Sequence, residues 1–182
     1  VNVLRYWPIY PQFLRDLFIM DFTSGLVDPN SGRVRNSEWR GALADARDAI
    51  FYCAQCGAEN FYDVEALKAS GGQPGACWSC SSDLRLPPRI RIEGQVVMLN
   101  HDTQLFPHHV DSARRYDFSK PVAEVTQHPK NPKIWGLKNV SGDKWVITTL
   151  DGEIKDVTPG RTVTLSKETR ISFGKAEGEI AV

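Results

Sequence analysis

Two Cys-x-x-Cys pairs constrain the fold of this chain more than any other feature of its sequence. They contain all four of its cysteines: Cys53 with Cys56, and Cys77 with Cys80. A two-residue spacing lets one tight turn direct both sulfurs at a single point. Two such pairs therefore predict a tetrahedral four-cysteine zinc site. Gly57 fits this geometry, because the residue after the second ligand of a pair often needs a positive φ.

Other uses of four cysteines are disulfides, a redox site or an iron site. Nothing in the sequence marks a secreted chain, and a reducing cytosol disfavours disulfides. A thioredoxin-like site needs one pair on a βαβ frame, which the sequence does not indicate. Iron can occupy the same four sulfurs, and the spacing does not separate it from zinc. With four protein ligands no position is left for water or substrate, so we expect a structural metal that holds together a segment too small to fold alone.

Charge and hydropathy limit the classes of function. The 182 residues include 22 basic and 22 acidic side chains, and this balance argues against a dedicated nucleic-acid binder. No apolar run approaches the length of a membrane span, so no membrane partner is expected. The start of the sequence lacks the pattern of a signal peptide, and we expect a cytoplasmic protein. The first residue is valine rather than methionine, as in a fragment of a longer chain.

The first segment, residues 1–50, has the periodicity of helices. Two apolar stripes recur at helical spacing, and Asn36 or Ser37 is the expected N-cap of the second helix. The first stripe is Phe13, Leu14, Leu17 and Phe18, and the second is Trp39, Ala42, Leu43, Ala46 and Ile50. Each stripe predicts a helix packed on a core.

The remaining chain divides into a metal module and a β-rich part. Residues 51–86 are expected to form a zinc ribbon of two short hairpins held by the metal. Pro87-Pro88 marks a boundary, and residues 87–182 contain roughly eight or more short apolar runs with the spacing of a β-sandwich. The expected turns between strands are 100–102, 141–143, Asp151-Gly152 and Pro159-Gly160. The predicted fold class is mainly β with an N-terminal helical segment.

No set of residues in the sequence has the pattern of a catalytic site. There is no phosphate-binding glycine loop, no nucleophile elbow and no pair of carboxylates placed for acid–base chemistry. The histidines are His101, His108, His109 and His128, and none has a companion ligand at metal-binding spacing. We therefore expect a binding or regulatory module rather than an enzyme.

The whole chain resembles the C-terminal region of a family of bacterial serine/threonine protein kinases. The motifs that carry this resemblance are Pro11–Phe18, Tyr52–Asn60, Pro121–Val125 and Trp135–Asn139. These kinases are encoded beside a von Willebrand factor A protein and a metal-dependent protein phosphatase, in operons linked to tellurite resistance. The resemblance implies that the von Willebrand factor A protein is a partner and that the phosphatase is a second one.

Residues 1–50 also resemble the end of a kinase C-lobe. Gly25–Pro29, followed by Arg33 and the helix at Trp39, is similar to the Asp-Pro-x-x-Arg turn and final helix of protein kinases. Three residues rather than two separate Pro29 from Arg33, which departs from that pattern. The glycine-rich loop, the strand lysine, His-Arg-Asp and Asp-Phe-Gly are absent from this chain. We therefore expect no phosphotransfer by this polypeptide.

Residues 90–176 resemble a forkhead-associated domain, a β-sandwich that binds phosphothreonine. The resemblance runs through Ser119, Leu137–Asp143, Pro159-Gly160 and Ile171–Gly174. The Gly-Arg, the histidine of Ser-x-x-His and the Asn-Gly pair of that family are replaced here. Without that arginine, binding of phosphate loses its main charged donor. A sandwich retained for protein contacts is therefore the leading expectation.

The leading hypothesis is a non-catalytic, zinc-containing docking region of a bacterial protein kinase. By resemblance, von Willebrand factor A domains often hold Mg²⁺ and accept a carboxylate from a partner. Asp102, Asp143 and Asp151 lie in expected turns and are candidates for that carboxylate. The alternatives are a phosphothreonine reader, which needs a basic pocket, and a nucleic-acid-binding zinc ribbon, which zero net charge disfavours.

Overall fold

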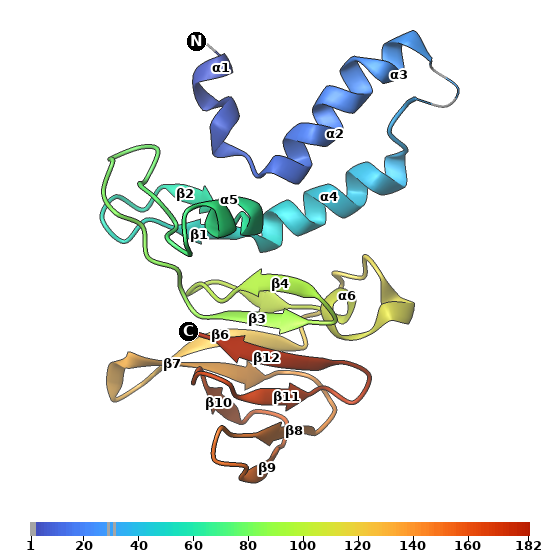
Figure 1. The fold of residues 1–182 in the computed structure, drawn as a ribbon. Helices are drawn as coiled ribbons and strands as arrows, with labels where there is room; N and C mark the ends of the chain where they lie inside the picture. Colours follow the sequence, from blue (N-terminus) through green and yellow to red (C-terminus); the bar gives the residue numbers. More distant parts are fainter. Residues whose placement is uncertain (1–2, 29, 31) are drawn as a thin grey trace. The chain divides into compact units, whose positions relative to one another are not determined.

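The structure is a computed structural model, and it describes residues 3–28, 30 and 32–182 (Figure 1). Within these residues the chain is mainly β, with twelve strands in three antiparallel sheets after a short helical segment. It divides into two compact units, Val1–Leu86 and Pro87–Val182. No helix in the described part of the chain combines the length and the apolar character that crossing a membrane requires. Pro29, part of the kinase-like turn expected from the sequence, lies outside the described residues.

The first unit begins with helices. They are α1 (Val3–Tyr6), η1 (Trp7–Ile9), α2 (Gln12–Phe22), α3 (Ser24–Val27) and α4 (Asn36–Asp48). The expected N-cap of α4 is wrong, because the helix already begins at Asn36. Its preceding residue, Arg35, donates its backbone N–H to the Glu38 carboxylate at 2.7 Å, which closes the first turn.

The helices pack through a small core. Leu14 of α2 and Ala42 and Ala46 of α4 are buried, with Leu17, Trp39 and Phe61 packed against them. The small side chains of the two alanines leave room for the facing helix. The rings of Phe18 and Trp39 pack edge-to-face, with their centroids 4.7 Å apart. Leu43, expected in the buried stripe, is 57 % exposed, so that part of the prediction is wrong.

The rest of the first unit consists of very short elements. β1 (Ile50–Tyr52) pairs with β2 (Glu59–Phe61), and α5 (Val64–Ala69) follows. The Asp63 side chain caps α5 by accepting N–H groups of Glu65 and Ala66. The second expected hairpin is reduced to a single bridge between Ala76 and Asp83. The prediction of two hairpins is therefore correct only for the first.

The second unit contains two antiparallel sheets. The first has the order β4-β3-β12-β11-β8-β9, and the second has the order β10-β7-β6-β5. Two short helical segments, α6 and η2, separate β5 from β6. The bounds are β3 Arg89–Ile92, β4 Gln95–Met98, β5 Gln104–Leu105, α6 Pro107–Val110, η2 Ser112–Arg114, β6 Ala123–His128, β7 Asn131–Asn139, β8 Trp145–Thr148, β9 Ile154–Val157, β10 Thr162–Thr164, β11 Arg170–Ser172 and β12 Glu177–Ala181.

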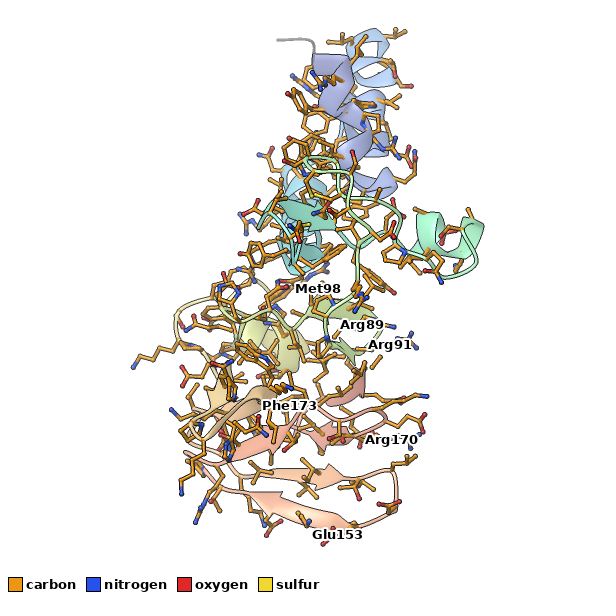
Figure 2. The ribbon with its side chains drawn as sticks, turned by 90° about the vertical axis from the view of Figure 1, so that its left-hand side faces the viewer. Arg89, Arg91, Met98, Glu153, Arg170 and Phe173 are labelled. Atoms are coloured by element: carbon orange, nitrogen blue, oxygen red, sulfur yellow. The ribbon has the colours of Figure 1, made fainter. Side chains whose placement is uncertain are left out.

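Both sheets contribute to one hydrophobic core. Ile90, Ile171 and Ile180 come from the six-stranded sheet, and Leu105 and Leu137 from the four-stranded sheet, all fully buried. Alternation along the strands places these side chains inward and leaves charged ones outside. Figure 2 shows the outer side chains of Arg89, Arg91 and Arg170, which belong to β3 and β11. Two apolar faces turned toward one another are what a two-layer β unit requires.

The expected turns lie between strands. Residues 100–102 connect β4 to β5, 141–143 connect β7 to β8, and Asp151-Gly152 connects β8 to β9. Pro159-Gly160 connects β9 to β10. Gly152 and Gly160 have φ values of 79° and 83°, which explains the choice of glycine at both turns.

Candidate metal centre

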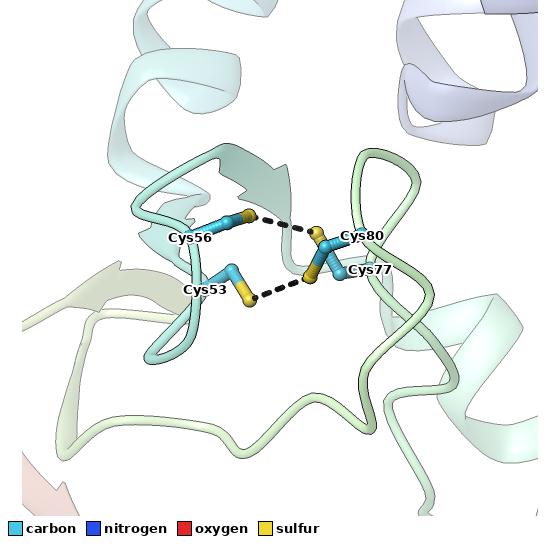
Figure 3. Close-up of side chains that lie close together, drawn as sticks. All are labelled: Cys53, Cys56, Cys77 and Cys80. Carbon is cyan, nitrogen blue, oxygen red and sulfur yellow. Dashed lines mark hydrogen bonds between the residues drawn. The ribbon is translucent and has the colours of Figure 1, made fainter.

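The four cysteines come together in the first unit (Figure 3). Cys53 Sγ lies 3.7 Å from Cys80 Sγ, and Cys56 Sγ lies 3.8 Å from Cys77 Sγ. All four sulfurs lie within 4.8 Å of one another, and none is in a disulfide. A tetrahedron with Zn–S bonds of about 2.3 Å has S–S edges of about 3.8 Å. The cluster is therefore a candidate metal site with dimensions that zinc fits.

The first cysteine pair is shaped by a tight turn after β1. The N–H of Gly57 donates to the Cys53 carbonyl oxygen, and the N–H of Cys53 donates to the Ala58 carbonyl oxygen, both at 2.9 Å. Gly57 has a φ of 74°, as expected for this position. This turn leaves both sulfurs of the pair on the same side of the chain.

The second pair repeats the same hydrogen bonds. The N–H of Ser81 donates to the Cys77 carbonyl oxygen at 2.9 Å, and the N–H of Cys77 donates to the Ser82 carbonyl oxygen at 2.8 Å. Ser81 occupies the place of Gly57 and has a φ of 61°. A left-handed serine costs more than a glycine, so the sequence alone does not reveal that the two turns are equivalent.

The two cysteines of each pair differ in burial, and burial is one of the influences on the pKa of Cys77. Cys53 and Cys77 are buried, whereas Cys56 and Cys80 are exposed. Burial by itself raises the pKa of Cys77, but the backbone N–H groups of Cys80 and Ser79 and the Asn60 amide outweigh it and lower the pKa to about 6. The site thus favours a thiolate at its buried centre.

The thiols of Cys56 and Cys80 show how charge is shared among the sulfurs. The N–H of Ala58 lowers the pKa of Cys56, but the neighbouring Cys80 sulfur, with smaller effects of burial, Cys53 and Cys77, raises it to about 11. The Ser82 hydroxyl and backbone lower the pKa of Cys80. Four thiolates so close together need a cation, and a bound divalent metal deprotonates its thiol ligands.

Asn60 supports the cluster from outside and was not found by sequence reasoning. It is buried on β2, and its Nδ2 lies 3.8 Å from Cys77 Sγ and donates to the Ala58 carbonyl oxygen at 2.9 Å. The register that places Asn60 opposite Phe51 brings it there. Side chains that hold metal ligands in place are often as important as the ligands. Nothing in the spacing of the cysteines marks this residue.

The three candidate aspartates are not brought together. Asp143 precedes β8 and Asp151 follows it, so they lie at opposite ends of the six-stranded sheet. Asp102 follows β4, at the same end as Asp151 but beside the other edge strand, since β4 and β9 are the two edges. All three side chains are exposed. Each is therefore a separate candidate contact rather than part of one cluster.

Ser119, which the forkhead-associated resemblance singles out, is held by a carboxylate. Its hydroxyl donates to Asp117 Oδ1 at 2.6 Å, and its N–H donates to the same oxygen at 3.0 Å. His108 and His109 each accept a backbone N–H at Nδ1, from Tyr116 and Phe106. Both histidines thus brace the segment between β5 and β6.

Comparison with known proteins gives no relative for this chain. No known protein family, curated protein or solved structure matches it. The fold and the site themselves define a mainly β protein with a candidate four-sulfur metal centre. With four sulfurs converging from two turns, such a centre has no open coordination position and would brace the chain rather than catalyse a reaction.

Proposed function

We propose that this chain is a non-catalytic, zinc-containing regulatory and docking region of a bacterial serine/threonine protein kinase. In this proposal it binds a von Willebrand factor A domain protein within a phosphorylation signalling system. The observation that carries the proposal is a closed four-cysteine centre in the first unit of a chain whose second unit consists of two antiparallel sheets. A metal that serves structure leaves protein surfaces available for contacts.

The helical segment supports its assignment to the end of a kinase lobe. Ile19 and Phe22 of α2 and Leu26 of α3 are 51, 61 and 67 % exposed. A helix with apolar side chains on several faces is typical of one covered by another protein surface. The rest of a kinase lobe would provide such a surface, and the catalytic residues would then lie in that lobe rather than in this chain.

The buried Asn139 supports the assignment of residues 87–182 to a forkhead-associated-like sandwich. Its Nδ2 donates to the carbonyl oxygens of Asp143 and Val157 at 2.8 and 2.9 Å, and its Oδ1 accepts from Ser141. These bonds fix the turn between β7 and β8, within the motif that carries the resemblance. The motif is therefore explained by a structural role that needs no phosphate.

The environment of Ser119 favours protein docking over phosphothreonine reading. Its hydroxyl and its N–H both donate to Asp117, so neither donor is directed at an external anion. A carboxylate at this point also repels a phosphate group. The family arginine is replaced by the stretch Leu105–His109. Recognition of a folded, unphosphorylated surface is the remaining use of this part of the sandwich.

The proposed mechanism uses a carboxylate from this chain to complete the coordination of Mg²⁺ on the partner. The candidates remain Asp102, Asp143 and Asp151, and because they lie apart, one of them suffices. When a carboxylate that coordinates a buried cation is removed, no other group of this chain replaces its charge. We therefore expect its removal to cost several kcal/mol of binding free energy, about a hundredfold or more in affinity. High salt alone weakens such a contact less than it weakens a purely charged surface.

The test is a calorimetric titration of the unphosphorylated von Willebrand factor A protein, with and without a chelator of Mg²⁺. Each aspartate is changed to alanine, and Asp156→Ala serves as the matched control on the exposed strand β9. We expect binding that is lost with chelator and with one of the three variants, but kept in the control. Binding that appears only after threonine phosphorylation would favour the phosphopeptide reader. Binding indifferent to chelator and to all three changes would exclude the carboxylate mechanism.

A further inference from the structure

One hairpin of the second unit extends beyond its own sheet. β6 and β7 pair with each other as far as His128 and Asn131, but β5 pairs only with residues 123–124 and β10 only with residues 136–138. Figure 1 shows this hairpin reaching past the neighbouring strands. Every residue from 127 to 134 is exposed. We call these eight residues the hairpin tip.

The hairpin tip is held in one shape although it buries nothing. The Gln127 side chain donates to the Pro132 carbonyl oxygen at 2.6 Å, and the N–H of Lys133 donates to the Asn131 side chain at 3.1 Å. Pro129 and Pro132 further restrict the backbone. A two-stranded ribbon with no core is only marginally stable in water by itself. Its fixed shape reduces the entropy that a binding partner would have to overcome.

All charged side chains of the tip are positive. No aspartate or glutamate occurs between Glu124 and Asp143, whereas Lys130 and Lys133 both lie in the tip. Lys138, nearer the sheet, forms an ion pair with Glu124 at 2.9 Å. Among the described residues, none forms an ion pair with Lys130 or Lys133. Ile134, the last residue of the tip, is 37 % exposed, so the tip also carries an apolar side chain.

We infer that the hairpin tip is a contact surface for the protein partner, and that the partner presents carboxylate groups around a small apolar patch. This inference rests on the proposed docking function and names a surface that performs it. Charge complementarity selects the partner's chemistry, since two lysines without acidic neighbours attract carboxylates and repel basic surfaces. Non-specific nucleic-acid binding gains its affinity by neutralising phosphates and releasing their counterions, and two lysines neutralise few of them. An acidic protein surface is therefore the occupant.

The test compares two double variants that change the net charge equally. Lys130→Glu with Lys133→Glu reverses the tip, and Lys155→Glu with Lys167→Glu reverses two exposed lysines elsewhere in the same unit. The probe is the Mg²⁺-loaded von Willebrand factor A protein, titrated at low and at moderate salt. We expect the tip variant to bind about tenfold or more weakly and to lose most of the salt dependence, while the control stays within about twofold. Ile134→Asn should weaken binding without changing its dependence on salt.

The outcomes separate this inference from the proposed function. If the unmodified chain does not bind the von Willebrand factor A protein, the docking function fails and the inference fails with it. If the unmodified chain binds and the tip variant binds equally well, docking stands and the tip is excluded as its surface. Retention on duplex DNA that only the tip variant loses would assign the tip to nucleic acid and overturn the inference. Thermal unfolding of both double variants should match that of the unmodified chain, because all changed side chains are exposed.

Discussion

Gly136 shows how a single residue fixes the distance between two strands. It lies on β7 beside β10, and a Cβ atom there would meet Thr162 Cγ2 and would lie 2.8 Å from the Val163 carbonyl oxygen. Backbone atoms cannot move away as a flexible side chain can. Any side chain at this position must therefore push β10 away from β7.

We expect Gly136→Ala to lower the free energy of unfolding by about 1–3 kcal/mol, the usual cost of overpacking. Gly142→Ala is the matched control, because Gly142 has open space around its Cα and no left-handed φ. That change should stay within about 0.5 kcal/mol. Chemical denaturation followed by circular dichroism measures both, and equal stability of the two variants would contradict the steric argument.

Asp117 is the second residue whose surroundings have a measurable effect, in this case on the pKa of its carboxyl group. Hydrogen bonds from the Ser119 hydroxyl and backbone N–H, followed by the Arg114 guanidinium, lower its pKa from 3.8 to about 2. A carboxyl group whose pKa is depressed by folding stabilises the native state above its unfolded pKa. That contribution is complete above about pH 4 and is lost as the pH falls toward 2.

We expect an NMR titration of the Asp117 carboxyl carbon to show a midpoint well below 3.8. The free energy of unfolding of Asp117→Asn should fall less between pH 4 and pH 2 than that of the unmodified chain, because the asparagine side chain takes up no proton in this range. Ser119→Ala should raise the Asp117 midpoint, since it removes the first of the donors. A midpoint at the ordinary value would show that these hydrogen bonds do not form in solution.

At the scale of elements, the metal module has little structure of its own. β1 and β2 have three residues each, and α5 has six residues of which none is buried. Elements this short are not stable in water without tertiary support. A metal held by both cysteine turns would supply that support, at about 10–16 kcal/mol for zinc-finger peptides.

We expect the purified chain to hold one zinc ion, and Cys77→Ser to lose it and to unfold residues 51–86 before the rest. Elemental analysis gives the metal content, and amide hydrogen exchange locates the unfolding. Ser79→Ala is the control, because its side chain lies in the same exposed turn and supplies no sulfur. A metal-free chain with a fully protected module, or disulfides among the four cysteines, would refute the zinc assignment.

At the scale of the whole molecule, each of the two units has a hydrophobic core of its own. Among the described residues, the helices of the first unit share a core of three buried side chains, whereas both sheets of the second share a core of sixteen. The second unit therefore has the larger hydrophobic core, and a metal bound by the four cysteines would add stability to the first.

We expect no ATP binding and no phosphotransfer by this chain, because every nucleotide-binding and catalytic motif of a kinase is missing from its sequence. Isothermal titration with Mg-ATP should give only heats of dilution. A titration of the metal-depleted chain with zinc, in the same instrument, provides the positive signal for comparison. Saturable heat with Mg-ATP would show that the chain has a nucleotide site.

Local signals in the sequence predicted much of the fold and the centre of the candidate site. The spacing of the cysteines indicated the cluster, and glycine marked turns with positive φ at Gly57, Gly152 and Gly160. Strands with apolar runs, such as the one at Ile90, were found because burial on one face leaves a pattern of period two. β12 was missed because alternating glutamates and a glycine leave only Ile180 as an apolar signal.

The sequence by itself determined the candidate ligand set, the turns and the mainly β character, because each depends on residues close together in the chain. Tertiary structure alone decided which residues meet across strands. It placed Asn60 beside Cys77, and it put Asp102 beside the opposite edge strand of the six-stranded sheet from Asp151. These outcomes follow from strand register and sheet order, which long-range packing sets and which no local pattern encodes.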